Sequence, residues 1–121
     1  MTNNAEIKSI KLDNISINFN VENSESFKLE ISTESRMLPP KIKDDKTALY
    51  VIKAKIITPD SDQININATA KIVFEFDEIP TNYDEAGQKL CLKKSQVLIF
   101  DKIGEIMETM GYQRFEIEIP E

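Results

Sequence analysis

The sequence predicts an α+β fold, with a four-stranded antiparallel sheet covered on one face by a C-terminal helix or helices. Apolar and polar residues alternate in four stretches before Pro80, which is the period of β-strands. Beyond Pro80 the apolar residues follow the period of a helix. The chain of 121 residues is long enough for one domain, so we expect a single domain over residues 1–121, with residues 1–5 disordered.

The alternation predicts strands at residues 6–19, 27–32, 48–57 and 64–79. In the first strand the apolar positions change parity at Asp13–Asn14, which predicts a β-bulge or a kink within one long strand. The last strand has the most regular alternation in the chain. Its apolar residues are expected to share one buried face: Ile64, Ile66, Ala68, Ala70, Ile72, Phe74 and Phe76.

Polar segments connect the predicted strands. The segment "RMLPPKIKDDKT" at residues 36–47 contains two prolines and a cluster of charges, so we interpret it as a long loop. The segment "TPDSDQ" at residues 58–63 is typical of a turn. Its Asp60 and Asp62 lack the glycine and the terminal glutamate of an EF-hand loop, so we interpret them as turn residues and not as a calcium site.

A helical segment is predicted to end at Met110. Thr81 and Asn82 are suitable N-caps, and Gly111 is placed as the left-handed residue that ends a helix. Gly87 is expected to interrupt an initial short helix, and the final "RFEIEIPE" is expected to form a short strand or an extended arm. The stripe expected to face the sheet consists of Leu92, Ile99, Ile103, Ile106 and Met110, widened by Phe100 and Met107.

Val97 and Leu98 give this helix a second apolar face beside the predicted stripe. Two interpretations remain open: the helix is buried over half of its circumference, or the second face meets another subunit or a ligand. Burial of one Leu side chain contributes about 1.5–3 kcal/mol, so a few such residues hold an oligomer together. We therefore place Val97, Leu98 and the nearby Asp101 at the interface of a homo-oligomer, a dimer or a tetramer.

The composition argues against several classes of function. The net charge is −6 and only Arg36 and Arg114 are arginines, which disfavours binding to a nucleic-acid backbone. No apolar run approaches the ~20 residues of a membrane span, so we expect no membrane partner. The chain has no histidine and only three glycines, which disfavours catalysis, a metal site and a phosphate-binding loop. We therefore expect neither an enzyme nor a cofactor.

Cys91 is the only cysteine of the chain, so no intrachain disulfide is possible. Without a histidine partner, a packed or partly exposed thiol is expected here and not a nucleophile. The N-terminal "MTNNAEIKS" has neither the basic region nor the hydrophobic stretch of a signal peptide. These features favour a cytoplasmic protein.

Four stretches resemble the SecB family of protein-export chaperones. They are "DNISINF" at residues 13–19, "FKLEIST" at residues 27–33, "LYVIKAKI" at residues 49–56 and "LIFDKIGE" at residues 98–105. The resemblance implies a four-stranded antiparallel sheet followed by helices, assembled as a dimer of dimers.

The sequence departs from the family's pattern at several positions. Asp101 stands where the family has a proline, and Asn14 and Asn18 stand where its export chaperones carry acidic residues that help to dock the SecA motor. These asparagines weigh against SecA docking. Glu30, Glu75 and Asp77 are nevertheless expected to keep the polar face of the sheet acidic.

The resemblance implies an ATP-independent holdase that binds unfolded or precursor polypeptides, either for export or for a toxin–antitoxin pair. SecA or an antitoxin are the further partners that it implies. The alternative is a non-enzymatic adaptor or inhibitor that binds one folded partner. Exposed apolar side chains, methionine among them, suit promiscuous clients. The candidate client-binding residues are Met37 and Leu38 in the proline loop, followed by Tyr83 and Tyr112.

Overall fold

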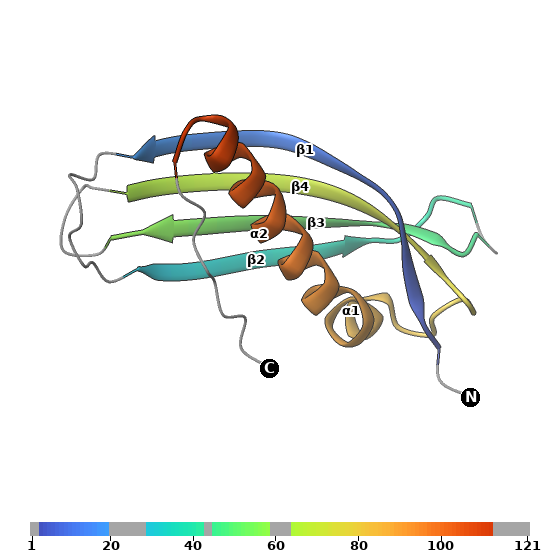
Figure 1. Ribbon diagram of the computed structural model, residues 1–121. Coiled ribbons are helices and arrows are strands. Elements are labelled where there is room, and N and C mark those ends of the chain that lie inside the picture. Colours follow the sequence, from blue (N-terminus) through green and yellow to red (C-terminus); the bar gives the residue numbers. More distant parts are fainter. Residues whose placement is uncertain (1–2, 20–28, 43–44, 59–63, 113–121) are drawn as a thin grey trace.

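The α+β fold is confirmed by the computed structural model, which describes residues 3–19, 29–42, 45–58 and 64–112. Four antiparallel strands form one sheet in the order β1-β4-β3-β2, and one long helix crosses a single face of that sheet (Figure 1). The strands are β1 (Ala5–Phe19), β2 (Glu30–Leu38), β3 (Thr47–Ile57) and β4 (Ile64–Phe76). The predicted C-terminal arm lies outside the described residues.

The core lies between the sheet and the helical segment. The predicted buried face of β4 is confirmed, because each of its apolar residues from Ile64 to Phe76 is at most 3% exposed. The corresponding residues of β3, such as Tyr50 and Ile52, are also buried, since β3 pairs with β4 in the centre of the sheet. The buried residues that α2 (Leu92–Thr109) adds to this core are Ser95, Ile99, Phe100, Ile103, Gly104 and Met107.

β1 is an edge strand with two register shifts, between Ile7 and Ser9 and between Leu12 and Asn14. The second confirms the irregularity predicted at Asp13–Asn14, whereas the bulge at Lys8 was not predicted. Because a bulge inserts one extra residue, each shift restores the alternation that the sequence breaks. As a result, five apolar residues of β1 lie on the helix side of the sheet, where they are half-buried: Ile7, Ile10, Leu12, Ile15 and Ile17.

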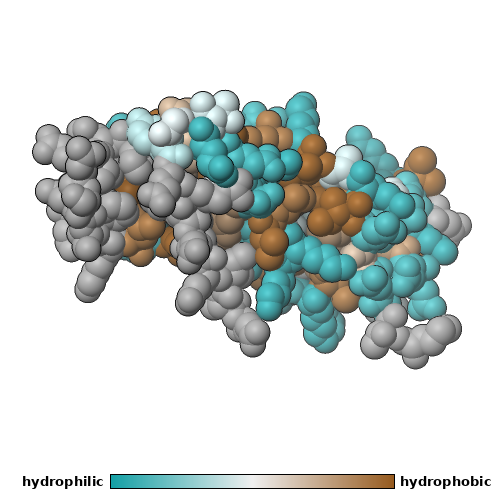
Figure 2. Space-filling model, viewed as in Figure 1, coloured by the Kyte–Doolittle hydropathy of each residue, from teal (hydrophilic) through white to brown (hydrophobic). Residues whose placement is uncertain are grey.

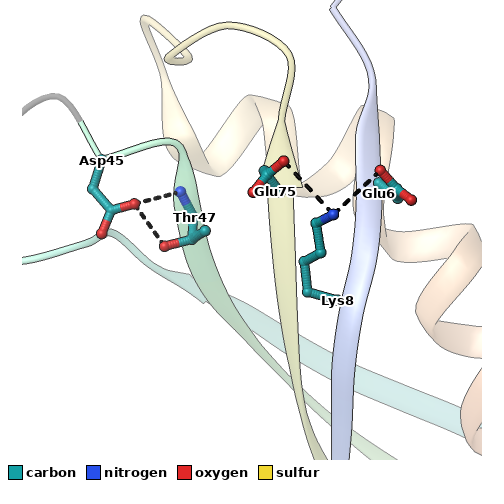
Figure 3. A network of polar contacts seen from close by, with 5 residues as sticks. All are labelled: Glu6, Lys8, Asp45, Thr47 and Glu75. Carbon is teal, nitrogen blue, oxygen red and sulfur yellow. Dashed lines mark hydrogen bonds and ion pairs between the residues drawn. The ribbon is translucent and has the colours of Figure 1, made fainter.

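The bulge residue Lys8 lies between two carboxylates on the other face of the sheet (Figure 3). Glu6 and Glu75 are register partners across β1 and β4, an arrangement of like charges that is unfavourable. The Lys8 Nζ atom is 3.6 Å from Glu6 and 3.7 Å from Glu75, so it offsets their repulsion. Nearby, the Asp45 carboxylate accepts hydrogen bonds from the N–H and the hydroxyl of Thr47, at 2.9 and 2.7 Å, where β3 begins.

At the second bulge a carboxylate lies beside one member of a pair of like-charged lysines. Lys11 and Lys71 are register partners, and the Asp13 carboxylate of the bulge lies 3.7 Å from the Lys71 Nζ atom. Each bulge of β1 therefore places the opposite charge beside a pair of like charges.

The outer face of the sheet is mixed in charge and not acidic. Glu30 and Glu75 lie on it as expected, but Asp77 follows the end of β4, where its N–H donates to Asn4. The expectation of an acidic face was wrong because the register also brings lysines of three strands to this side. Its charged residues are Lys8, Lys11, Arg36, Lys53, Lys55 and Lys71 against Glu6, Asp13, Glu30, Glu34 and Glu75.

The helical segment runs without a break through α1 (Tyr83–Ala86), the π-helical turn η1 (Gly87–Cys91) and α2. The predicted caps are confirmed at Asn82, whose side chain accepts from the Glu85 N–H at 3.1 Å, and at Gly111, whose φ is +94°. Gly87 does not interrupt the helix. A Cβ atom there would lie 3.1 Å from a ring carbon of Tyr50, so glycine lets the helix approach β3 closely.

Three other expectations need correction. β2 extends to Leu38, so the loop predicted at residues 36–47 is shorter. The sequence did not predict the full length of β2 because most of its residues are polar, as an edge strand permits. The disorder predicted for residues 1–5 does not hold for residues 3–5, since Ala5 is buried in β1 and the Asn3 side chain bonds Glu78. Finally, Met110 is 50% exposed, and Ile106 is only half-buried, because α2 turns residues 99, 103 and 107 toward the sheet.

Substitution Lys8→Glu is expected to lower the free energy of unfolding by about 0.5–1 kcal/mol, because it places a third carboxylate beside Glu6 and Glu75. Urea denaturation measures this change. Lys55→Glu is the matched control, since Lys55 is an exposed residue of the same face whose register partners, Ser32 and Asn67, are uncharged. Equal stabilities of the two variants would show that the bulge lysine does not relieve this repulsion.

Candidate functional site

The candidate site is a groove of about 600 Å³ between the beginning of β1 and the helical segment. We call it the β1–α2 groove. Its apolar lining comes from Ile7 of β1, Leu90 of η1 and two residues of α2. The complete lining is Ile7, Lys89, Leu90, Lys93, Lys94, Val97, Leu98 and Asp101.

The groove is open because α2 crosses the sheet diagonally and leaves apolar side chains of β1 partly uncovered (Figure 1). Figure 2 shows hydrophobic surface on this face of the molecule, with hydrophilic residues around it. Val97 points away from the buried stripe and is 52% exposed, whereas Leu98 is half-buried against the core. The first interpretation, in which the second apolar face is buried within the chain, therefore holds in part for Leu98. It does not hold for Val97.

Lysines surround the apolar lining of the groove. The Lys94 Nζ atom donates to the Ala5 carbonyl at 2.5 Å and to the Asn4 side chain at 3.2 Å, which ties α2 to the start of β1. Both of these acceptors are uncharged, so they leave the ammonium charge of Lys94 at the rim. Lys89 pairs with Glu85 at 2.6 Å, and this hydrogen bond lowers the pKa of the Glu85 carboxyl.

The structure brings together the three residues predicted at a subunit interface. Val97, Leu98 and Asp101 all line the β1–α2 groove. Their proximity to Ile7 and Leu90 has no local signal in the sequence, because it depends on the register of β1 and on the path of the helical segment through the π-helical turn. No signal in the sequence places the three lysines beside an apolar groove.

The four predicted client-binding residues do not form one surface. Met37 is 6% exposed and lies in the core beside Gly87, so the expectation that it lines an open groove is corrected. Leu38 is 36% exposed, but alternation along β2 places it on the outer face. Tyr83 packs edge-to-face on Phe76, with ring centroids 6.2 Å apart.

Tyr112 is half-buried immediately after α2. Its N–H donates to the Met107 carbonyl at 2.9 Å, and the Gly111 N–H donates to Glu108 at 3.0 Å, which is the hydrogen-bond pattern of a Schellman motif. The roles of Leu38, Tyr83 and Tyr112 in client binding stay predictions.

The cysteine and the acidic side chains are the groups to consider for a nucleophile or a metal site. Cys91 is fully buried, and burial raises the pKa of its thiol to about 12, so the thiol remains protonated at neutral pH. Within the described ranges, no three His, Cys, Asp or Glu side chains gather where they would hold a metal ion. Asp60 and Asp62 lie outside these ranges. None of the described helices has the length and apolar character needed to cross a membrane.

The Cys91 thiol is expected to react with a disulfide reagent at pH 8 only after the protein unfolds, because the folded protein keeps it buried and protonated. The ordinary thiol pKa is 9.0, so above this pH the unfolded thiol ionises while the folded one does not. The contribution of Cys91 to stability is therefore lost between pH 9 and about pH 12. The rate of labelling is measured by absorbance, with and without urea. Rapid labelling of the folded protein would contradict a buried and protonated Cys91 thiol.

Comparison with known proteins identifies the fold. No family model and no curated protein matches the sequence. Among solved structures, the chain is similar to the Mycobacterium tuberculosis Rv1957 SecB-like chaperone, which was determined in complex with a ChAD peptide from the Rv1956 HigA1 antitoxin. The TM-score is 0.77 at 10% identity, over 98% of this chain and 91% of the other. The chain therefore has a SecB-like fold, as the resemblance implied.

Proposed function

We propose that this protein is a molecular chaperone that holds extended, apolar-rich segments of unfolded polypeptides in the β1–α2 groove. The observation that carries the proposal is an open groove whose apolar residues belong to the folded framework of the chain. The likeness to a SecB-like chaperone determined with a bound peptide supports it.

The physical basis is burial of apolar surface, which contributes about 25 cal/mol per Å² and does not require a particular sequence. Val97, Leu98 and Ile7 supply such surface. Because β1 and α2 already hold these residues in place, little conformational entropy is lost on the chaperone's side when a client binds. Most of the conformational entropy lost on binding is therefore lost by the client, which favours weak and reversible binding of unfolded segments.

A second candidate is an adaptor that serves one partner, such as an antitoxin. One observation favours it: the similar structure holds a peptide from an antitoxin. The breadth of clients separates the two proposals. A holdase is expected to suppress aggregation of two unrelated unfolded proteins, one helical and one all-β, whereas a dedicated adaptor is expected to protect neither.

Homo-oligomerisation through Val97, Leu98 and Asp101 competes with client binding, because one surface cannot be buried by a second copy and a client at once. A two-fold interface brings a patch against itself. In the β1–α2 groove this would bring Lys89, Lys93 and Lys94 of each copy toward the same lysines of the other. We therefore assign the groove to a client, and any assembly of copies to another surface.

Substitution Val97→Asp is expected to reduce suppression of client aggregation at least tenfold, because it places a carboxylate in the apolar lining. A tenfold loss corresponds to about 1.4 kcal/mol, less than the full burial of a Val side chain contributes. Light scattering of an aggregating client measures the effect. Met110→Asp is the matched control, since Met110 lies just after α2, is 50% exposed and does not line the groove.

Circular dichroism must show that both variants keep their secondary structure. Equal protection by the two variants would contradict client binding in this groove. If Val97→Asp instead converts a dimer or tetramer into a monomer, as measured by sedimentation, the groove is a subunit interface and the assignment to a client is wrong.

A further inference from the structure

We propose that the client site continues from the β1–α2 groove into a second hollow beside Ile79 and Pro80, where the same extended client segment is held by a second apolar anchor. This inference rests on the proposed function and specifies the client, which is a segment with two apolar stretches. The preference comes from the shape and the apolar lining of the two hollows and not from their charge.

The second hollow lies at the end of the sheet where β1 begins and where β4 leads into α1 (Figure 1). Its volume is about 410 Å³, and we call it the Ile79 hollow. Its lining comes from the connection between β4 and α1, from the helical segment and from Asn3 before β1. The apolar residues of this lining are Ile79, Pro80, Ala86 and Leu90.

The two hollows meet at η1. Lys89 and Leu90 line both of them, so a chain that leaves the β1–α2 groove at this end enters the Ile79 hollow. The groove itself follows the helical segment from Lys89 to Asp101, a length of about 18 Å at the rise of an α-helix. An extended chain advances about 3.3 Å per residue, so five or six residues fill the groove and a longer segment is needed to reach Ile79.

The connection that carries Ile79 is anchored at both ends. At its start, the Asn3 side chain accepts from the Glu78 N–H and donates to the Glu78 carbonyl, both at 2.9 Å. At its end, the Asn82 side chain caps α1. Between these points Pro80 fixes its own φ and restricts the backbone of the residue before it. The Ile79 side chain, which is 42% exposed, is therefore held by a stiff connection, and little entropy of the chaperone is lost when a client covers it.

A single exposed isoleucine is common on protein surfaces and by itself indicates no binding site. Ile79 differs because it shares a hollow with Pro80 and Leu90, and Leu90 also belongs to the β1–α2 groove. Apolar contacts in both hollows are therefore available to one chain at the same time. When two weak contacts are linked in this way, the second becomes intramolecular, and the affinity of the whole segment exceeds that of either contact alone.

The test uses three fluorescent peptides without charged residues. The short peptide has one apolar stretch of about six residues, the length that fills the β1–α2 groove. The long peptide has two such stretches joined by a Gly-Ser spacer, and in the long control peptide the second stretch is replaced by Gly and Ser. Anisotropy titrations with the full chain are expected to show that the long peptide binds about tenfold more tightly than the other two.

Ile79→Asp is expected to remove this gain, because it places a carboxylate in the Ile79 hollow. The long peptide then loses about tenfold in affinity, while the short peptide keeps its affinity within about twofold, which also shows that the variant is folded. Ile79→Ser repeats the test without an added charge. Ile42→Asp is the matched control, since Ile42 is 71% exposed and lines neither hollow, and it should leave both affinities unchanged.

The outcomes separate the inference from the proposed function. If none of the peptides binds, the proposed function is wrong. If the short peptide binds and the second apolar stretch adds less than about twofold, the chaperone proposal stands and the inference about the Ile79 hollow is wrong. The inference is also overturned if Ile79→Asp weakens the short and the long peptide equally, or acts no differently from Ile42→Asp. If Ile79→Asp changes the oligomeric state measured by sedimentation, a second copy covers the hollow and the inference is again overturned.

Discussion

The structure depends on a mismatch in area between one helix and the sheet that it covers. α2 has 18 residues, so it is about 27 Å long and about 10–12 Å across. β1, with 15 residues, extends for about 50 Å before its bulges are considered, and the four strands lie about 4.8 Å apart. A single diagonal helix cannot cover such a face. The central strands β3 and β4 are therefore buried, while Ile10 and Ile15 near one edge and Ile31 near the other stay partly exposed.

The bulges of β1 determine which residues are left at the uncovered edge. Without them, period-two alternation would turn part of the apolar set of β1 to the outer face. With them, Ile7 and Leu12 lie on the same side, and the extra residues Lys8 and Asp13 carry their charges to the other side. The same two insertions also interrupt the regular hydrogen bonding of an edge strand, which reduces its tendency to pair with other chains. The two bulges of β1 therefore both turn its apolar residues toward the groove side and protect the edge of the sheet.

The sequence was a reliable guide wherever local physics decides the outcome. The alternation of β4, the irregularity at Asp13, the N-cap Asn82 and the left-handed Gly111 all follow from the neighbouring residues and were predicted. β2 was predicted too short because an edge strand needs few apolar residues, and "STESR" contains none. The pairing with β3, which extends from Glu30 to Leu38, determines the length of β2 instead of its own pattern of apolar residues.

The groove itself was only partly predictable. Val97 and Leu98 were recognised because surplus apolar residues on a helix are visible in the sequence. Their neighbours were not, since the contact between Ile7 and the helical segment spans most of the chain and depends on the bulge at Lys8. Met37 illustrates the opposite error: an apolar residue next to prolines suggested an exposed loop, whereas its register opposite Tyr50 places it in the core.

The electrostatic effect of this chain on a partner depends on where its charges lie and not on its net charge alone. The carboxylates outnumber the basic side chains by 21 to 15, yet the register gathers six cations on the outer face and the helix gathers three at the groove. Within the described residues the two kinds of charge nearly balance, at 13 carboxylates and 12 basic side chains. Since screening limits each charge to a range of about 8 Å, these regions act on partners independently. The described part of the fold thus intersperses charges of both signs, and the apolar groove lies among Lys89, Lys93, Lys94 and Asp101.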